Sequence, residues 1–232
     1  MPDDPRALRR PGTRAGLNKD AIVAAARTVY DRGGLPGLTM RAVSRELAVA
    51  PNALYSHVRS KDELVDAVID GILGEIEIPD EDLEWRDALR KLMVGSRPVL
   101  LKHGSMMQEF QSRATRGENA LRLGESTLRI LARAGIHGEA AVTALRVLLV
   151  YTIGFIAQEI PRVADPDGVR RKQQSEDAYR GSEMRPLSRA LATELSAHPD
   201  SRVFETGLDW LLDGIADLAS LRIGINITRP SS

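Results

Sequence analysis

The chain has 232 residues, of which 43% are hydrophobic and 28% are charged, so it is long enough to bury a core and polar enough to be soluble. It contains no cysteine, which excludes disulfide bonds and thiol chemistry and fits a reducing cytoplasm. The net charge is zero, but residues 1–61 hold eleven Lys and Arg against five Asp and Glu, whereas residues 62–232 hold 21 against 27. A basic end joined to an acidic body is typical of proteins that meet nucleic-acid phosphate at one end, although a solvated basic tail would have the same composition.

The start of the chain is polar and has no apolar run, so no signal peptide is predicted. Residues 1–16 carry four arginines among proline and glycine, and we expect them to form a disordered arm. Such an arm could follow DNA phosphates or enter a minor groove, or it could be a plain tail. The longest apolar run, 147–157, is shorter than the roughly 20 residues that a membrane span needs. We therefore expect a cytoplasmic protein with no membrane partner.

Residues 18–61 show the spacing of three helices, of which the last two are short. Asn18 is a helix cap, and apolar residues follow at helical spacing until the glycines at 33–34 end the first helix. Thr39 can cap a second helix through its hydroxyl. Pro51 suits the start of a third, because the first helical position does not need an N–H. This spacing predicts a helix-turn-helix, an element that reads DNA in the major groove.

The third helix is expected to pack through Leu54 and Val58 on the helix before it. A helix as short as 51–57 is marginal alone, so its neighbours must hold it. The opposite face is then left to small, polar and aromatic side chains, with Tyr55 near its edge. These side chains are Asn52, Ala53, Ser56 and His57.

The remainder of the chain is also predicted to be helical, and no stretch alternates as a strand does. Lys61 opens an apolar helix that ends before an acidic break at 79–84. Beyond the break we expect helices at 85–103, 105–113, 118–134, 138–160, 187–197 and 201–225, with a mobile polar loop at 162–185. The predicted fold class is all-α, with an arm at 1–16, a three-helix helix-turn-helix DNA-binding domain at 17–78, and a larger ligand-binding and dimerisation domain at 79–232.

The stretch from Leu17 to Ile69 resembles the N-terminal domain of the tetracycline repressor family. The shared features are a long helix, Gly-Leu-Thr-x-Arg, Leu-x-Val, Leu-Tyr-x-His-Val, and a lysine before a leucine-containing helix. Residues 82–162 resemble the C-terminal domain of tetracycline repressors, through a tryptophan-led helix, a helix end at 131–135, and Thr-Ile-Gly-Phe at 152–155.

The resemblance implies a homodimer whose N-terminal domains bind successive major grooves of a palindromic operator in double-stranded DNA. It also implies an unidentified small-molecule effector in the C-terminal domain. Carried over by position, phosphate contacts fall to Thr39, Arg41 and Lys61. Contacts with base edges fall to Pro51, Asn52, Ala53 and Ser56, and contacts with the DNA backbone or thymine methyl region to Tyr55 and His57. Tyr55 and His57 could instead be packing residues.

Three positions depart from the family pattern. Ala48 stands where glycine is usual, and a turn residue there needs a positive φ that strains alanine. Ala50 is a poor cap where serine is common. The magnesium-ligating histidine of the short C-terminal helix has no counterpart between Met106 and Gln111, so tetracycline–magnesium is a poor candidate effector. We expect no metal and no cofactor.

Several C-terminal residues could line a ligand cavity, because methionine and aromatic side chains adapt to varied ligands. They could equally be ordinary core. Glu159 could pair with a cationic ligand or be solvated. The candidates for ligand binding are His103, Met106, Met107, Phe110, Gln111, Tyr151, Phe155 and Gln158.

The segments 142–160 and 204–221 are apolar over wide arcs, so they must be buried. They are expected to form half of a four-helix dimer interface of more than roughly 2,000 Å²; the alternative is the core of a monomer.

No catalytic residues are predicted, because the chain lacks a phosphate-binding glycine loop, HExxH and a nucleophile elbow. The sequence favours a ligand-responsive transcriptional regulator, and specifically a repressor. The alternatives are a helical enzyme or small-molecule-binding protein with an incidental basic N-terminal domain, and an architectural DNA binder without an effector.

Overall fold

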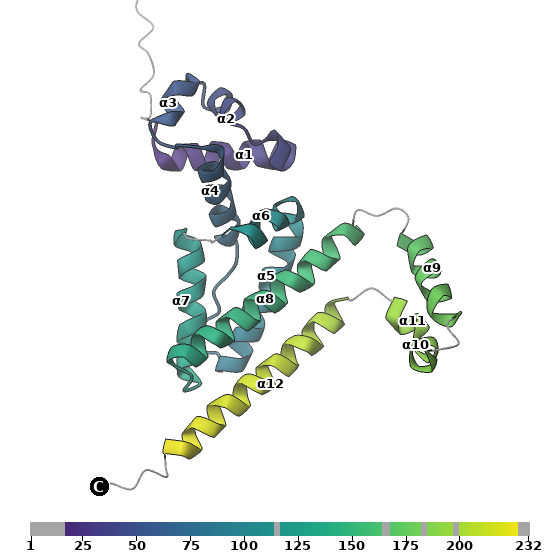
Figure 1. Ribbon diagram of the computed structural model, residues 1–232. Coiled ribbons are helices and arrows are strands. Elements are labelled where there is room, and N and C mark those ends of the chain that lie inside the picture. The colour runs from purple at the N-terminus through teal and green to yellow at the C-terminus, as the bar shows by residue number, and fades with distance from the viewer. Residues whose placement is uncertain (1–16, 114–116, 164–167, 182–184, 197–199, 227–232) are drawn as a thin grey trace, which may run out of the picture. The chain divides into compact units, whose positions relative to one another are not determined.

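The computed structural model describes residues 17–113, 117–163, 168–181, 185–196 and 200–226. Within these ranges every regular element is a helix (Figure 1), which confirms the predicted all-α class. The basic arm at 1–16 lies outside the described residues. The chain divides into two compact units, Met1–Gly71 and Ile72–Ser232, which we call the head and the body. The sequence had placed this boundary at residue 79.

The head begins with α1 (Lys19–Gly37), and the start of this helix is capped as predicted. The side-chain oxygen of Asn18 accepts a hydrogen bond from the backbone N–H of Ala21 at 2.8 Å. The backbone leaves helical geometry at Gly34, which has a φ of 60°. The glycine pair therefore ends the regular part of α1, because glycine accepts a positive φ without steric cost.

Three further helices follow in the head: α2 (Met40–Glu46), α3 (Pro51–Tyr55) and α4 (Lys61–Leu73), of which the last two residues belong to the body. The Thr39 hydroxyl oxygen accepts the N–H of Ala42 at 3.1 Å, so it caps α2 as expected. Val43 and Leu54 are fully buried and Val58 is nearly so. This shared burial holds the short α3 against its neighbours.

The turn between α2 and α3 has Ala48 at a φ of 52°, which confirms the strain expected there. The Ala48 N–H bonds to the Arg45 carbonyl at 3.1 Å, and the Val49 N–H bonds to the Ser44 carbonyl at 3.0 Å. These two bonds form a Schellman helix end, in which the left-handed position usually belongs to glycine. The body ends α7 with the same pair of bonds, but there Gly135 takes the left-handed position with a φ of 76°.

The body is built on α5, α7, α8 and α12, whose inward side chains form one hydrophobic core. The core includes the fully buried Leu89, Leu131, Leu148 and Leu208. Two short elements, η1 and α6, connect α5 to α7. The bounds are α5 (Trp85–Lys102), η1 (Gly104–Met106), α6 (Met107–Ser112), α7 (Glu118–Arg133), α8 (Gly138–Val163) and α12 (Ser201–Asn226).

The predicted mobile loop at 162–185 is wrong, because α9 (Gly168–Arg180) occupies much of it. Its polar side chains gave no apolar period to detect, and pairs one turn apart support it instead, such as Gln173 to Asp177 at 3.2 Å. Two short helices, α10 (Pro186–Ala190) and α11 (Ala192–Ser196), pack beside α9. The Thr193 hydroxyl donates to Glu176 at 2.9 Å and lowers the pKa of that carboxyl group.

The other departure concerns the end of α8, which continues past Pro161 to Val163 instead of stopping before the proline. Proline removes one N–H donor and crowds the preceding turn. It does not prevent the residues that follow it from keeping helical backbone angles.

Among the described residues, one stretch of α8, Gly138–Ile160, has the length and apolarity of a membrane span. Its mean hydropathy is 2.0, and 28% of its most apolar 18-residue window is buried. Charged and polar residues interrupt this stretch, so the longest unbroken apolar run in the sequence, 147–157, covers only part of it. Ala144 and Leu148 face the body core, whereas Val142 and Val150 are exposed. The helix is therefore a core element on one side and an apolar surface on the other.

Replacing Ala48 with glycine is expected to stabilise the head by about 1 kcal/mol, because glycine adopts a positive φ without the clash that alanine suffers. The measurement is hydrogen exchange of the backbone amides in α1 and α4, whose protection reports the free energy of opening this unit.

Ala24→Gly provides the matched control, since Ala24 is exposed within the regular part of α1. It is expected to lose about 0.5–1 kcal/mol. A loss of protection in both variants would show that Ala48 is not strained.

Candidate functional site

The outer face of the helix-turn-helix is exposed, as the sequence predicted for a surface that meets DNA. Pro51, Asn52, Ser56 and His57 are exposed, and Tyr55 exposes 52% of its surface. Ala53 is half-buried. Leu54 is the residue of α3 that packs in the core of the head, so the opposite face of α3 is available to a partner.

The basic side chains near this face lie at helix starts. Arg41 is exposed in the first turn of α2, and Lys61 is exposed at the first residue of α4. The start of α4 is fixed by two bonds: Ser60 Oγ accepts the Glu63 N–H at 3.3 Å, and Glu63 accepts the Arg59 N–H at 2.8 Å. The Thr39 hydroxyl oxygen is engaged in capping. Arg59 is exposed beside Lys61 and was not singled out from the sequence.

A bidentate ion pair joins α1 to α2 in the head. Arg32 donates to the two carboxylate oxygens of Glu46 at 2.8 and 2.9 Å. Such a pair fixes orientation as well as distance. It joins the end of α1 to the end of α2 at the surface, where such a pair contributes about 0–1 kcal/mol.

The body contains an apolar cavity of about 130 Å³ between α5, α7 and α8. The end of α4 and α6 contribute one wall each. Three buried hydroxyl groups are its polar features, and no lining side chain carries a charge. The lining residues are Leu73, Ile76, Leu92, Met93, Ser96, Leu100, Phe110, Ala120, Leu123, Gly124, Thr127, Leu145, Leu149, Thr152 and Ile153.

Of the ligand-binding candidates from the sequence, Phe110 lines this cavity. Tyr151 and Phe155 instead form an aromatic cluster with Phe204 of α12. Tyr151 stacks on Phe204 with ring centres 5.5 Å apart, and Phe155 meets the same ring edge-on at 5.2 Å. The cluster joins α8 to α12.

Tyr151 is fixed further by its hydroxyl, which donates to the Phe204 carbonyl at 2.8 Å. Burial raises the pKa of this phenol above its ordinary value. A side chain at Gly207 would overlap the Tyr151 ring, so the close approach of the two helices requires glycine there. Tyr151 is therefore held by packing and hydrogen bonding on α12.

The remaining candidates divide between the interior and the surface, and none is among the residues lining the cavity. Met106 and Met107 are buried in η1 and α6. His103 is also buried, with its Nε2 atom 3.4 Å from a carboxylate oxygen of Glu75. Gln111 and Gln158 are exposed. Among the described residues no group of three His, Asp or Glu side chains is arranged to hold a metal ion.

Glu159 is paired with an arginine of the body, so it is neither solvated nor free to pair with a cationic ligand. This corrects both interpretations made from the sequence. Arg97 of α5 pairs with it through two nitrogen atoms, one of them at 3.0 Å from Oε2. The two side chains expose 18% and 16% of their surfaces. Arg97 also donates to the Ser201 hydroxyl at 3.0 Å, so one guanidinium group connects α5, α8 and the start of α12.

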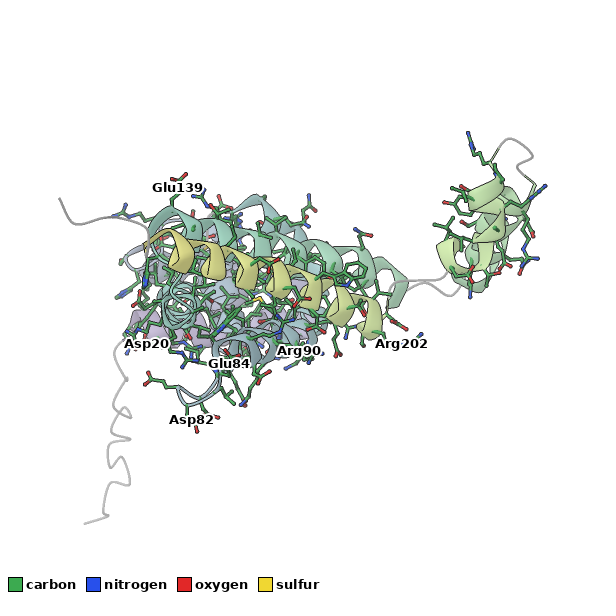
Figure 2. All side chains as sticks on the ribbon, turned by 90° about the horizontal axis from the view of Figure 1, so that it is seen from below. Asp20, Asp82, Glu84, Arg90, Glu139 and Arg202 are labelled. Carbon is green, nitrogen blue, oxygen red and sulfur yellow. The ribbon has the colours of Figure 1, made fainter. Side chains whose placement is uncertain are left out.

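Ion pairs also join α5 to α12, where Arg90 lies beside the last helix (Figure 2). Arg90 contacts Glu205 at 2.7 Å and Asp209 at 3.1 Å, and Arg86 contacts Asp213 at 2.6 Å. The hydrogen bonds to Glu205 and then Asp209 raise the pKa of Arg90.

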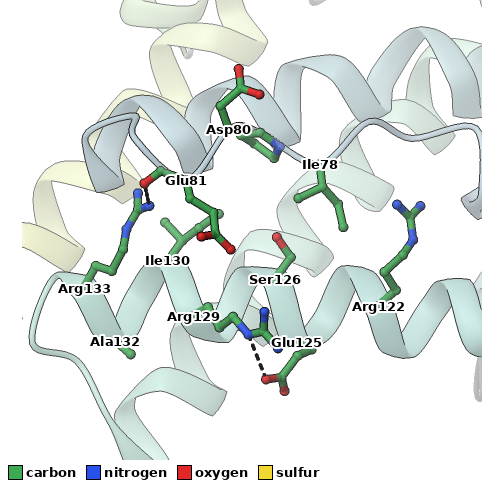
Figure 3. Close-up of a pocket in the computed structure, with 11 residues that line it drawn as sticks. Ile78, Asp80, Glu81, Arg122, Glu125, Ser126, Arg129, Ile130, Ala132 and Arg133 are labelled. Carbon is green, nitrogen blue, oxygen red and sulfur yellow. Dashed lines mark hydrogen bonds and ion pairs between the residues drawn. The ribbon is translucent and has the colours of Figure 1, made fainter.

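A second hollow, of about 480 Å³, lies on the surface between α7 and residues 78–81 (Figure 3). Its arginines already have partners. Arg133 donates to the Glu81 and Leu83 carbonyls, Arg122 donates to the Ile76 carbonyl, and Arg129 pairs with Glu125. The bonds of Arg133 and Arg122 attach the segment before α5 to α7, whereas the Arg129 pair lies within α7.

Sequence reasoning missed most of the cavity because its residues look like ordinary core. Hydroxyl groups within the apolar faces of α5, α7 and α8 were the available signal. Ser96 lies between Leu92 and Leu100, one helical turn from each, and Thr127 lies one turn from Leu123. A hydroxyl at such a position must be satisfied within its own helix or by a neighbour.

An exposed helix-turn-helix face on one unit, together with an apolar cavity in the other, is typical of a helix-turn-helix transcriptional regulator. Residues 22–68 match the family model described as bacterial regulatory proteins, tetR family, and residues 78–219 match the tetracyclin repressor-like C-terminal domain. The chain belongs to the tetR family of bacterial transcriptional regulators, which are not enzymes.

Individual relatives agree with this assignment. An HTH-type transcriptional regulator of Saccharopolyspora erythraea is 31% identical over 90% of the chain and 89% of its own length. The HTH-type transcriptional repressor DrrR1 of Streptomyces coeruleorubidus is 28% identical over 93% of the chain and 84% of its own length. The crystal structure of the TetR family protein ActR of Streptomyces coelicolor in complex with actinorhodin superimposes with a TM-score of 0.79 at 27% identity, covering 87% of this chain and 96% of that one.

Replacing Glu159 alone with alanine is expected to destabilise the body by about 2–3 kcal/mol, because the mostly buried Arg97 then lacks its carboxylate partner. Urea unfolding followed by circular dichroism measures this loss. The double replacement Arg97→Met with Glu159→Met removes both charges and should cost less than roughly half as much. A double variant as unstable as the single one would show that the pair itself stabilises the body.

Proposed function

We propose that this regulator is a repressor that binds a palindromic operator as a homodimer and leaves it when a small molecule occupies the body cavity. The observation that carries the proposal is the combination of an exposed α3 face with an uncharged internal cavity in the body. The named relatives support it, because one is a repressor and another was crystallised with a small molecule.

DNA recognition is assigned to α3 and to the basic residues at the starts of α2 and α4. Asn52 can pair with adenine through two hydrogen bonds, and Pro51 and Ala53 can contact thymine methyl groups. Tyr55 and His57 reach the sugar-phosphate backbone of the DNA, and Thr39, Arg41 and Lys61 contact DNA phosphates. Few hydrogen-bond donors of α3 face the bases. Ser56 and bridging water molecules are therefore expected to contribute to base recognition.

Release follows from linkage between the two units. A molecule that binds better to the body conformation with misaligned heads lowers DNA affinity, and DNA lowers its affinity by the same factor. Two heads must match half-sites about 34 Å apart, so a displacement of a few ångströms is sufficient. The ion pair between Arg97 and Glu159 and the Tyr151 cluster connect the helices that would move.

The homodimer is supported by apolar side chains that the isolated chain leaves in water. Val142, Leu149 and Val150 of α8 are exposed, and so are Trp210 (72%) and Leu218 of α12. A soluble monomer rarely exposes so large an apolar patch. Pairing of these faces in a four-helix interface would remove them from water, and it accounts for the apolar α8 without a membrane. We place the dimer in the cytoplasm, where its operator lies.

Replacing Lys61 with alanine is expected to weaken binding to every DNA sequence alike and to lower the slope of log affinity against log salt by about one, as for one lost phosphate contact. Fluorescence anisotropy at several salt concentrations measures both quantities, with DNA from upstream of the protein's own gene and a scrambled copy as probes.

Lys172→Ala on α9 is the control, since it removes the same charge from an exposed body position. Equal effects of the two replacements would contradict the assigned interface. Equal affinity of the unmodified protein for the scrambled copy would exclude a specific operator and favour an architectural DNA binder.

Replacing Trp210 with aspartate is expected to convert the dimer into a monomer of 25.4 kDa, because the charge would be buried in the interface. Sedimentation velocity measures the mass. Leu121→Asp on α7, at a position 66% exposed, is the matched control and should remain dimeric. A dimer that survives the Trp210 replacement would place the interface elsewhere.

A further inference from the structure

Building on the proposed effector role of the body cavity, we infer that its ligand is an uncharged aromatic molecule that donates hydrogen bonds, as a phenol does. The inference rests on the charge of the lining, the direction of three hydroxyl groups, and the size of the space. Each of these constrains a different property of the ligand.

The lining excludes an ionised ligand. Every lining side chain is apolar or a hydroxyl, and no Lys, Arg, Asp, Glu or His is among them. An ion buried in such a site would lose its hydration without gaining a counter-charge, which is strongly unfavourable. A carboxylate, an ammonium group or a metal chelate therefore finds no partner in this cavity.

Two of the three hydroxyl groups use their only proton within their own helix. Ser96 Oγ donates to the Leu92 carbonyl at 2.7 Å, and Thr127 Oγ1 donates to the Leu123 carbonyl at 2.9 Å. A hydroxyl oxygen that donates its proton still has lone pairs with which to accept. Both residues are more than nine-tenths buried, and no hydrogen bond among the described residues is donated to either oxygen.

The third hydroxyl has the weakest partner. Thr152 Oγ1 donates to the Met93 sulfur at 3.4 Å, and a thioether is a poor acceptor. Thr152 is 2% exposed, and its hydroxyl can turn toward a ligand as donor or acceptor. Ser96 and Thr127 present acceptors to the cavity from α5 and α7. These two acceptors favour a ligand with O–H or N–H groups over one that only accepts.

The size of the space fits a single aromatic ring. Apolar cavities of about 150 Å³ hold benzene, and this cavity has about 130 Å³. Phe110 supplies an aromatic wall on which a ring can pack edge-on or offset. A larger ligand would need the cavity to open further, with its first ring seated among the three hydroxyl groups.

The test compares three probes that differ in one substituent: 4-ethylphenol, 4-ethylanisole and 4-ethylbenzoate. At pH 7 the phenol is neutral and donates, the anisole is neutral and only accepts, and the benzoate is ionised. Ligand-observed NMR titration of the full chain gives each dissociation constant. We expect the phenol to bind about fivefold more tightly than the anisole, as for one net hydrogen bond, and the benzoate not to bind.

Valine replacements locate the effect, because they keep the shape of threonine and remove its oxygen. One phenol O–H makes one hydrogen bond, so Thr127→Val is expected to weaken phenol binding by up to about fivefold and to leave anisole binding unchanged. Thr152→Val is expected to change the affinity for both neutral probes by a similar factor, because its hydroxyl can turn to accept or to donate. Thr143→Val is the matched control. Thr143 makes the same type of hydrogen bond, to the Glu139 carbonyl at 2.9 Å, but is exposed on α8 and does not line the cavity.

Equal affinity for phenol and anisole, tighter binding of the benzoate, binding of none of the three, or equal effects of all three valine variants would each overturn the inference. Operator binding is measured on the same samples by anisotropy. If the protein binds its operator specifically but does not prefer the phenol, the ligand class is refuted and the proposed function is not. If the unmodified protein does not bind its operator specifically, the proposed function is refuted whatever the probes show.

Discussion

The burial of Leu54 makes the exposed face of α3 possible. A helix of five residues is far shorter than the helices that are stable alone in water. Leu54 is fully buried and Val58 exposes 3%, and each such side chain contributes about 1.5–3 kcal/mol when it leaves water. Their removal from the surface fixes which side of α3 faces outward. The Thr39 cap and the pair between Arg32 and Glu46 then hold α2 as the surface on which α3 rests.

The sequence predicted those parts of the fold whose signals are local. The caps at Asn18 and Thr39 and the glycine end of α1 each follow from one or two residues, and all are confirmed. The positive φ at Ala48 is confirmed too, but it was expected from the family resemblance, in which glycine is usual at this position. Helix α9 was missed because it is held by polar pairs and by Thr193 of α11, which leave no apolar period. The cavity was missed for a different reason: a lining residue differs from a core residue only in what faces it across the body, and helical spacing does not contain that information.

Helix α8 connects the three properties of the body. Thr152 and Ile153 line the cavity, Tyr151 packs on α12, and Val150 lies on the exposed apolar face. These four consecutive residues point in different directions because successive helical positions are about 100° apart. A movement of α8 at Thr152 would therefore also reach its packing on α12 and its outer face, because one rigid helix carries all three.

The ion pairs between α5 and α12 recur at intervals of one helical turn. Arg86 and Arg90 lie one turn apart, and so do Glu205, Asp209 and Asp213. A slide of α12 by one turn, about 5.4 Å, would give each arginine a new carboxylate, whereas a smaller slide would leave them between partners. The ion pairs alone therefore allow several registers of α12 along α5. The close contact between the Tyr151 ring and Gly207 selects one of them. A side chain at position 207 is accordingly compatible only with a residue smaller than tyrosine at position 151, whereas glycine at 207 accepts any residue there.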